Sequence, residues 1–263
     1  MTKFSRRFAA CLFALSAVAA LPAWADEAKQ SHLDAILASK VLRIGMTGDY
    51  RPFSYLNPAT NAFEGIDVDM ANALGAALGA KVTFVQTSWS HMLDDLLADK
   101  YDVAMGGVSI NLDRQKSALF STPFMVDGKT PVARCADQGK YQTLEAIDRP
   151  DVTVVTNPGG TNEKFDRAML KQAKIMVYPD NKTIWQQIID GKADLMITDA
   201  IETRLWQKEH PALCAIHPDK PFNFSEKAYL LPRDPIWKDF VDQWLHQAIG
   251  SNAFAAVLAH WVK

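Results

Sequence analysis

The sequence lacks several features that would assign it to a class of proteins. It has no basic excess, since 28 Lys and Arg residues face 30 Asp and Glu residues, whereas a nucleic-acid-binding surface needs clustered positive charge. Its six histidines show no metal-ligand spacing. After residue 25 no stretch is apolar over the roughly 20 residues that span a bilayer. These absences argue against a nucleic-acid-binding protein, a histidine metal site and a polytopic membrane protein.

The first 25 residues have the pattern of a secretory signal peptide. Lys3, Arg6 and Arg7 precede an uncharged apolar run over 8–20, which is too short for a membrane anchor. We expect cleavage after Ala25, a periplasmic location, and no membrane attachment afterwards. Cleavage removes three positive charges from a net charge of −2, so the mature chain carries −5. An anionic ligand must therefore be held by local positive charge.

Cysteine is scarce. Cys11 leaves with the signal peptide, so only Cys135 and Cys214 remain in the exported chain. Because the periplasm is oxidising and a single pairing exists, we predict a disulfide. It would close a loop of about 80 residues, which the chain-entropy estimate equates with about 4 kcal/mol. The alternative is two separate buried thiols, and neither cysteine has the motif of a catalytic nucleophile.

Two α/β units follow one another along the chain. Apolar periodicity predicts, for the first unit, strands 41–46, 81–86 and 101–105 with helices 66–78 and 89–99. It predicts, for the second unit, strands 152–155, 174–177 and 194–198 with helices 163–173, 183–190 and 200–209. A short helix is expected at 32–38, and two final helices are expected at 235–249 and 252–262.

The order of these elements predicts an α/β protein with two lobes and two hinge crossings. Strands that alternate with helices indicate a parallel sheet covered by helices in each lobe. The crossings are expected at 120–132 and near 228–231. We therefore divide the chain into a signal peptide, a first lobe, a second lobe and a return to the first lobe, namely 1–25, 26–131, 132–226 and 227–263. Ligands bind at the carboxyl ends of such strands, which here would face the cleft between the lobes.

Three clusters fall at strand-to-helix junctions, where they would line the cleft. The first is 48–53, the second is 106–114, and the third is 157–162. Glycines in the second cluster let backbone amides approach a ligand, and Arg114 can hold a carboxylate through two parallel hydrogen bonds. The third cluster opens a helix, so its free amides would point at a bound anion.

The segments 65–69 and 107–110, together with Arg114, resemble the type II periplasmic amino-acid-binding proteins. The resemblance covers nearly the whole mature chain and implies the two-lobed periplasmic binding protein-like fold of type II. It implies that Ser109 and Arg114 hold a ligand carboxylate. It also implies that Tyr50 packs on the ligand and that Asp199 holds the ligand's ammonium.

Other segments depart from simple binding proteins and resemble the secreted cyclohexadienyl dehydratases. They are 47–50, 87–89, 127–130, 157–165, 226–234 and the glutamate that follows Asp199 by three residues. The resemblance implies that Glu202 is the general acid, that Asn157 supports it, and that Trp89 packs near the substrate ring. It suggests a substrate-binding set made of Asp49, Tyr50, Trp89, Gly107, Ser109, Arg114, Lys129, Gly160, Thr161, Asn162 and Asp199.

The chemistry of that family suits these residue types. Prephenate loses hydroxide and carbon dioxide to become aromatic, so a proton must reach the leaving oxygen while decarboxylation supplies the electrons. One positioned carboxylic acid is the minimum, and it typically raises the rate by about 10²–10⁴-fold; no metal or cofactor is required. Its pKa must be raised by burial and by nearby negative charge such as Asp199. Without the resemblance, Glu202 would be read as a residue that favours its helix dipole, and Lys129 as a hinge residue.

Two other functions stay open at this stage. The same fold with Arg114 and Asp199 suits a periplasmic binding protein that delivers a polar amino acid to an ABC transporter, because fold alone does not decide function. A sensory module ranks last, because we find no transmembrane or signalling segment. In each case the expected partner is a small molecule and not a nucleic acid. The preference between prephenate and arogenate stays open, as does formation of a homo-oligomer.

Overall fold

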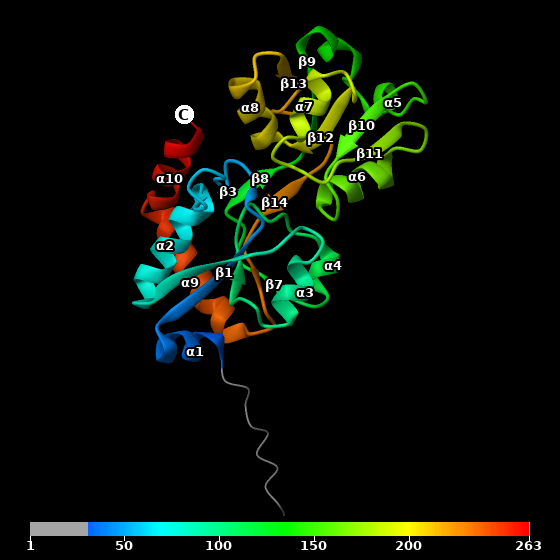
Figure 1. Cartoon of the computed structure of the whole chain (residues 1–263). Helices are drawn as coiled ribbons and strands as arrows, with labels where there is room; N and C mark the ends of the chain where they lie inside the picture. The colour runs from blue at the N-terminus through cyan, green and yellow to red at the C-terminus, as the bar shows by residue number, and fades with distance from the viewer. Residues whose placement is uncertain (1–30, 263) are drawn as a thin grey trace, which may run out of the picture. The chain divides into compact units, whose positions relative to one another are not determined.

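The computed structural model describes residues 31–262, in which two five-stranded sheets form the centres of two lobes (Figure 1). The sheet of the first lobe contains, in spatial order, β5 (Lys81–Gln86), β1 (Val41–Met46), β6 (Val103–Ala104), β15 (Leu230–Leu231) and β7 (Leu119–Phe120). Strand β1 is parallel to β5 and β6, whereas β15 is antiparallel to both of its neighbours. The segment that returns from the second lobe thus completes the first sheet.

Helix α2 shows how the sequence forms the first lobe. It spans Ile66–Leu78 and ends at Gly79, which adopts the left-handed conformation that glycine tolerates. Its buried face, with Met70 and Leu74, packs into the core of the lobe. The other helices of this lobe are α1 (His32–Ser39), α3 (Met92–Leu97), α4 (Leu112–Gln115), α9 (Pro235–Gly250) and α10 (Ala253–Val262).

Several predictions for this lobe were wrong. Its sheet is mixed and not parallel, because β15 runs antiparallel to β6 and β7. The strand predicted over 101–105 is reduced to Val103–Ala104. Helix α3 begins at Met92 and not at residue 89, because Ser88 starts a turn whose carbonyl accepts from the amides of His91 and Met92. The first cluster contains strand β2 (Asp49–Tyr50), which pairs with β3 (Ser54–Leu56), and β3 pairs in turn with β4 (Phe63–Glu64).

The sheet of the second lobe is mixed, which corrects the prediction of a parallel sheet. Its strands, in spatial order, are β11 (Lys174–Val177), β10 (Thr153–Thr156), β12 (Leu195–Asp199), β9 (Lys129–Arg134) and β13 (Leu213–Ala215). The first three are parallel, whereas β9 runs antiparallel between β12 and β13. Around them lie α5 (Leu144–Ile147), α6 (Thr161–Met169), α7 (Ile184–Ile189), α8 (Ala200–Glu209) and the 3₁₀ helix η1 (Cys135–Lys140). Strand β9 enters from the hinge, so it joins this sheet without a crossover helix.

The predicted disulfide is confirmed. Cys135 follows strand β9, and Cys214 lies in the neighbouring strand β13. Their sulfurs are bonded, with the two residues 79 positions apart in sequence. The bond therefore fixes the edge of the second sheet to the strand that enters from the hinge.

The two crossings lie side by side between the lobes. Strand β8 (Met125–Asp127) pairs antiparallel with β14 (Ser225–Lys227) (Figure 1). Lys129 follows β8 by two residues and already belongs to the second sheet. The division of the chain into lobes after residue 131 stays a proposal. The signal peptide and Cys11 fall outside the described residues. Within 31–262, the helices are too short or too polar to traverse a bilayer.

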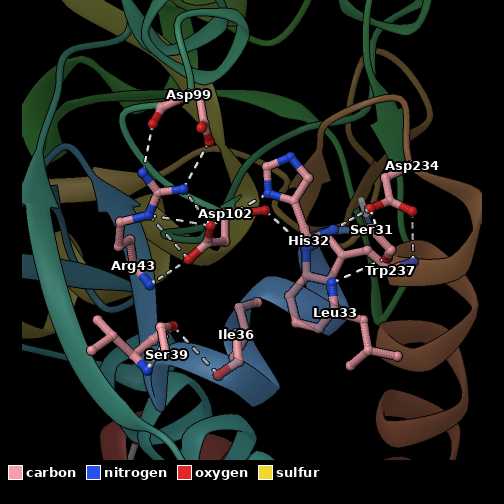
Figure 2. A network of polar contacts seen from close by, with 11 residues as sticks. Ser31, His32, Leu33, Ile36, Ser39, Arg43, Asp99, Asp102, Asp234 and Trp237 are labelled. Atoms are coloured by element: carbon pink, nitrogen blue, oxygen red, sulfur yellow. Dashed lines mark hydrogen bonds and ion pairs between the residues drawn. The ribbon is translucent and has the colours of Figure 1, made fainter. Parts of the chain in front are cut away.

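Helices α1 and α9 are joined to the first sheet by the polar network in Figure 2. Asp234 caps α9 through the Trp237 amide at 3.0 Å and accepts from Ser31 Oγ at 2.9 Å. Trp237 donates to the Asp102 carbonyl at 2.8 Å, while Arg43 forms an ion pair with the Asp102 carboxylate at 2.5 Å. Because Arg43 neutralises the Asp102 carboxylate, we interpret this polar network as structural and not as a site for a metal cation.

Candidate active site

A small cavity lies between the two lobes. Its walls come from loops at the carboxyl ends of strands in both sheets, as expected for α/β lobes. The lining residues are Tyr50, Trp89, Gly107, Ser109, Arg114, Asn157, Gly160, Thr161, Asn162, Asn181 and Asp199. The three clusters predicted from the sequence thus come together at one place. Of the proposed site residues, only Asp49, Lys129 and Glu202 do not line the cavity directly.

The loop around strand β2 connects the two lobes. The Tyr50 hydroxyl donates to Asp199 Oδ2 at 2.6 Å, across the cleft. The side-chain amide of Asn181, in the second lobe, donates to the Asp49 carbonyl at 3.0 Å. The Asp49 carboxylate accepts from Trp89 Nε1 at 3.0 Å, and burial raises the pKa of this carboxyl. Asp49 therefore orients the Trp89 ring, while Tyr50 and Asn181 hold the cleft closed.

Asp67 positions the glycine loop of the second cluster. Its buried Oδ2 accepts from the amides of Gly106 at 2.8 Å and Gly107 at 2.6 Å. Burial raises the pKa of Asp67 to about 6, although these amides oppose the shift. Gly107 has a positive φ of 71°, and a Cβ there would lie only 2.6 Å from the Tyr50 ring. Asp67 is thus a structural residue.

Arg114 brings an unpaired positive charge to the cavity. Asn111 caps helix α4 by accepting from the Arg114 amide at 2.9 Å, which fixes the start of the Arg114 side chain. The residue is 7% exposed, and its Nη1 has no hydrogen-bond partner in the described protein. Burial lowers the pKa of this guanidinium, which nevertheless stays charged because its ordinary pKa exceeds 12. A buried guanidinium nitrogen without a partner is suited to a ligand carboxylate.

The third cluster presents backbone amides and two asparagines. Helix α6 begins at Thr161, and the capping residue before it is Gly160. Because glycine has no side chain to cap the helix, the first amides of α6 are free for a ligand. Asn162 donates to Asn157 Oδ1 at 3.1 Å and to Thr198 Oγ1 at 3.0 Å. Both asparagines are buried, so their orientation is fixed by this network.

Two buried lysines meet at Asp199. Lys129 donates from Nζ to Asp199 Oδ1 at 2.7 Å and to Thr161 Oγ1 at 3.0 Å, and it also contacts Asn162 Oδ1. Lys227 donates from Nζ to Asp199 Oδ2. Burial alone would raise the pKa of Asp199, but the charges of the two lysines dominate and lower it well below its usual value. Asp199 is therefore a carboxylate at neutral pH, shared between two ammonium groups.

Glu202 is 2% exposed and lies behind the wall of the cavity. The Thr198 hydroxyl donates to Glu202 Oε2 at 2.5 Å and accepts from Asn162, which connects Glu202 to the cavity-lining asparagines. Burial raises the pKa of Glu202 to about 8; the Thr198 hydrogen bond opposes this shift and the charge of Asp199 adds to it. At neutral pH the group is therefore mostly a neutral carboxylic acid, as a proton donor requires.

Sequence reasoning missed Lys227, Thr198 and Asn181. Lys227 is fully buried, and it fell within a segment used for the family resemblance without being given a role. Thr198 was read as the last residue of a strand, and the only available signal was its place directly before Asp199. Asn181 lies in a connection where no motif singled it out.

Comparison with known proteins agrees with this architecture. Residues 42–263 match the model of the bacterial extracellular solute-binding proteins, family 3. The chain is 54% identical to the cyclohexadienyl dehydratase of Pseudomonas aeruginosa over 250 residues, which cover 95% of this chain and 93% of that protein.

Two solved structures of ancestral proteins are also similar. One is an amino-acid-binding protein described as a precursor of cyclohexadienyl dehydratase; it is 31% identical, has a TM-score of 0.82, and the match covers 89% of this chain and all of that one. The other is an ancestral cyclohexadienyl dehydratase; it is 48% identical, has a TM-score of 0.56, and the match covers 89% and 97%. The chain therefore belongs to family 3 of the bacterial extracellular solute-binding proteins, in the group that includes the cyclohexadienyl dehydratases.

Proposed function

We propose that this protein is a cyclohexadienyl dehydratase that converts prephenate into phenylpyruvate, and arogenate into phenylalanine, in the periplasm after cleavage following Ala25. The observation that carries the proposal is a buried carboxyl group, Glu202, whose pKa is raised to about 8 and which lies next to a cavity lined by Arg114. A protein that only binds an anion has no need of a protonated acid at this place. A dehydratase needs one, because hydroxide is a poor leaving group.

The cavity suits a substrate with an unsaturated ring and two carboxylates. The free Nη1 of Arg114 would bind one carboxylate, and the amides at the start of helix α6 would bind the other. Trp89 and Tyr50, whose ring centroids lie 5.7 Å apart, would contact the substrate ring. Gly160 lies beside Trp89 in the cavity wall, where an added Cβ would project toward Asn157 Nδ2 at 3.4 Å.

Glu202 would deliver the proton as the carbon–oxygen bond of the substrate breaks. The ring carboxylate then leaves as carbon dioxide, and the electron pair of its carbon–carbon bond completes the aromatic ring. Water forms from the departing hydroxyl and the proton of Glu202, which regains a proton from solvent before the next turnover. Glu202 meets the cavity through Thr198 and Asn162, and such contacts commonly tighten when substrate binds.

The hydrogen bonds across the cleft would support this chemistry. Tyr50 with Asp199, and Asn181 with Asp49, join the two lobes over the cavity. Closure excludes water, which strengthens the electrostatic interactions inside and keeps Glu202 protonated.

The test is to mix the purified protein with prephenate or arogenate and to follow phenylpyruvate or phenylalanine. Glu202→Gln should lower kcat by about 10²–10⁴-fold, the usual contribution of a general acid. The control is Glu145→Gln at an exposed position of helix α5, which should keep wild-type activity. No turnover of either substrate would refute the function, and full activity of Glu202→Gln would refute the assigned role.

A second candidate function is amino-acid delivery to a transporter. It is favoured by the family itself and by the 31% identity to an ancestral amino-acid-binding protein. Calorimetry with a panel of amino acids decides between the two: tight binding of one of them, with no turnover of prephenate, would support transport.

A further inference from the structure

Lys227 is a buried cation that the proton-transfer step does not use. It is fully buried at the end of the hinge strand β14. Its Nζ donates to Ser109 Oγ at 3.0 Å, to Tyr50 Oη at 3.1 Å and to Asp199 Oδ2. It also lies 5.0 Å from the centre of the Tyr50 ring and 5.8 Å from that of Phe53. A carboxylate, hydroxyl oxygens and aromatic faces are together what an ammonium ligand requires.

Lys227 and Lys129 leave Asp199 little capacity to bind anything else. A carboxylate offers about four acceptor positions. Oδ2 of Asp199 already accepts from Lys227 and from the Tyr50 hydroxyl, and Oδ1 accepts from Lys129. Only one position, on Oδ1, stays open within the described protein. Asp199 is therefore satisfied by the protein's own ammonium groups.

The charges around the cavity lead to the same conclusion. Arg114, Lys129 and Lys227 contribute three positive charges, and Asp199 contributes one negative charge. Glu202 is mostly neutral at pH 7. Both lysines are paired with Asp199, whereas Arg114 Nη1 has no partner in the described protein and is available to a ligand carboxylate. An ammonium on the ligand that approached Asp199 would meet like charge on the lysines.

We propose that Lys227 is a specificity-determining residue whose own ammonium occupies Asp199, so that the cavity favours a dicarboxylate with a keto group over one with an ammonium. The proposal rests on the proposed function and extends it to the choice between the two substrates. Prephenate carries a keto group where arogenate carries an ammonium group. Arogenate must therefore share the single open position of Asp199 or displace a lysine, and prephenate need not.

Lys227→Met tests this proposal, because methionine fills a similar apolar space without the charge. The measurement is kcat/KM for prephenate and for arogenate, in the variant and in the wild type. We expect the ratio of arogenate to prephenate to rise at least about tenfold, the effect of about 1.4 kcal/mol. A merely structural role would lower both values together and leave the ratio unchanged, and that result would overturn the proposal.

A binding measurement keeps the test independent of turnover and of this one variant. Calorimetry on the wild type with phenylpyruvate and phenylalanine, which differ in the same keto and ammonium groups, should show tighter binding of phenylpyruvate. Lys227→Gln, which also removes the charge, should reduce that preference, whereas Lys116→Gln at an exposed position should not. Equal binding of both compounds by the wild type would overturn the proposal. Failure of the proposed function would instead appear as absence of turnover, whatever the binding ratio.

Discussion

Replacement of Thr198 by valine isolates the link between Glu202 and the cavity. The Thr198 side chain is fully buried, and its hydroxyl accepts from Asn162 at 3.0 Å and donates to Glu202 at 2.5 Å. Valine keeps the size and removes the hydroxyl, which leaves a buried amide hydrogen and a buried carboxyl oxygen without this partner. Each loss costs about 1–3 kcal/mol. For a protein of this length, about 2–4 °C of Tm corresponds to 1 kcal/mol, so we expect Tm to fall by at least about 5 °C.

The same change should alter the titration of Glu202. The Thr198 hydrogen bond lowers the pKa of Glu202, so its removal should raise this pKa above about 8. The alkaline limb of the kcat/KM profile for prephenate should move to higher pH, and the plateau should fall about tenfold because Glu202 loses its orientation. Thr198→Ser is the control and should retain the wild-type profile. A Thr198→Val protein with wild-type Tm and an unchanged alkaline limb would refute the assigned hydrogen bond.

Three further results are expected. Reduction of the disulfide, or its replacement through Cys135→Ala with Cys214→Ala, should lower the free energy of unfolding by about 2–4 kcal/mol in a denaturant titration, since the bond closes a long loop. Asp67→Ala leaves the amides of Gly106 and Gly107 without their side-chain acceptor, so it should lower Tm and raise KM. The control is Asp69→Ala, which removes a hydrogen bond from Trp261 and should have smaller effects. Equal effects of the two variants would contradict the role assigned to Asp67. The pKa of Glu202 in the folded protein, about 8, exceeds its ordinary value of 4.5, so the stability from its burial is full below pH 4.5 and is lost as pH rises through 8. Between pH 5 and pH 9 the wild type should therefore lose about 2–5 kcal/mol more unfolding free energy than Glu202→Gln, and identical losses would argue against the raised pKa.

Several elements follow directly from the sequence because local signals agree with the tertiary structure. Helix α2 has apolar residues at helical spacing and a glycine at its end, and its predicted bounds match those of the structure. Strands β1 and β5 are bounded by turns and were also placed correctly. Strands β9 and β13 were missed, because their pairing depends on a segment that arrives from the other lobe and leaves no local pattern.

The candidate site likewise contains residues that the local sequence predicts and residues that it does not. Arg114, Ser109 and the third cluster were found because turn residues place them at strand ends, where clefts form. Lys227 was not found, because a lysine in a sequence is normally read as exposed. Its burial arises from contacts with Tyr50 and Asp199, which are distant in the chain. The raised pKa of Glu202, by contrast, was expected from the chemistry of the resembled family, and burial is its main cause in the structure.

The most direct test of Glu202 as a protonated general acid is the pH dependence of kcat/KM for prephenate. The acid must carry its proton, so activity should be constant at neutral pH and fall above about pH 8, where Glu202 ionises. Glu202→Gln, assayed at high enzyme concentration, should show low residual activity without this alkaline limb. A wild-type profile that falls near pH 4.5, or an alkaline limb that persists in Glu202→Gln, would contradict the assignment of Glu202 as the proton donor.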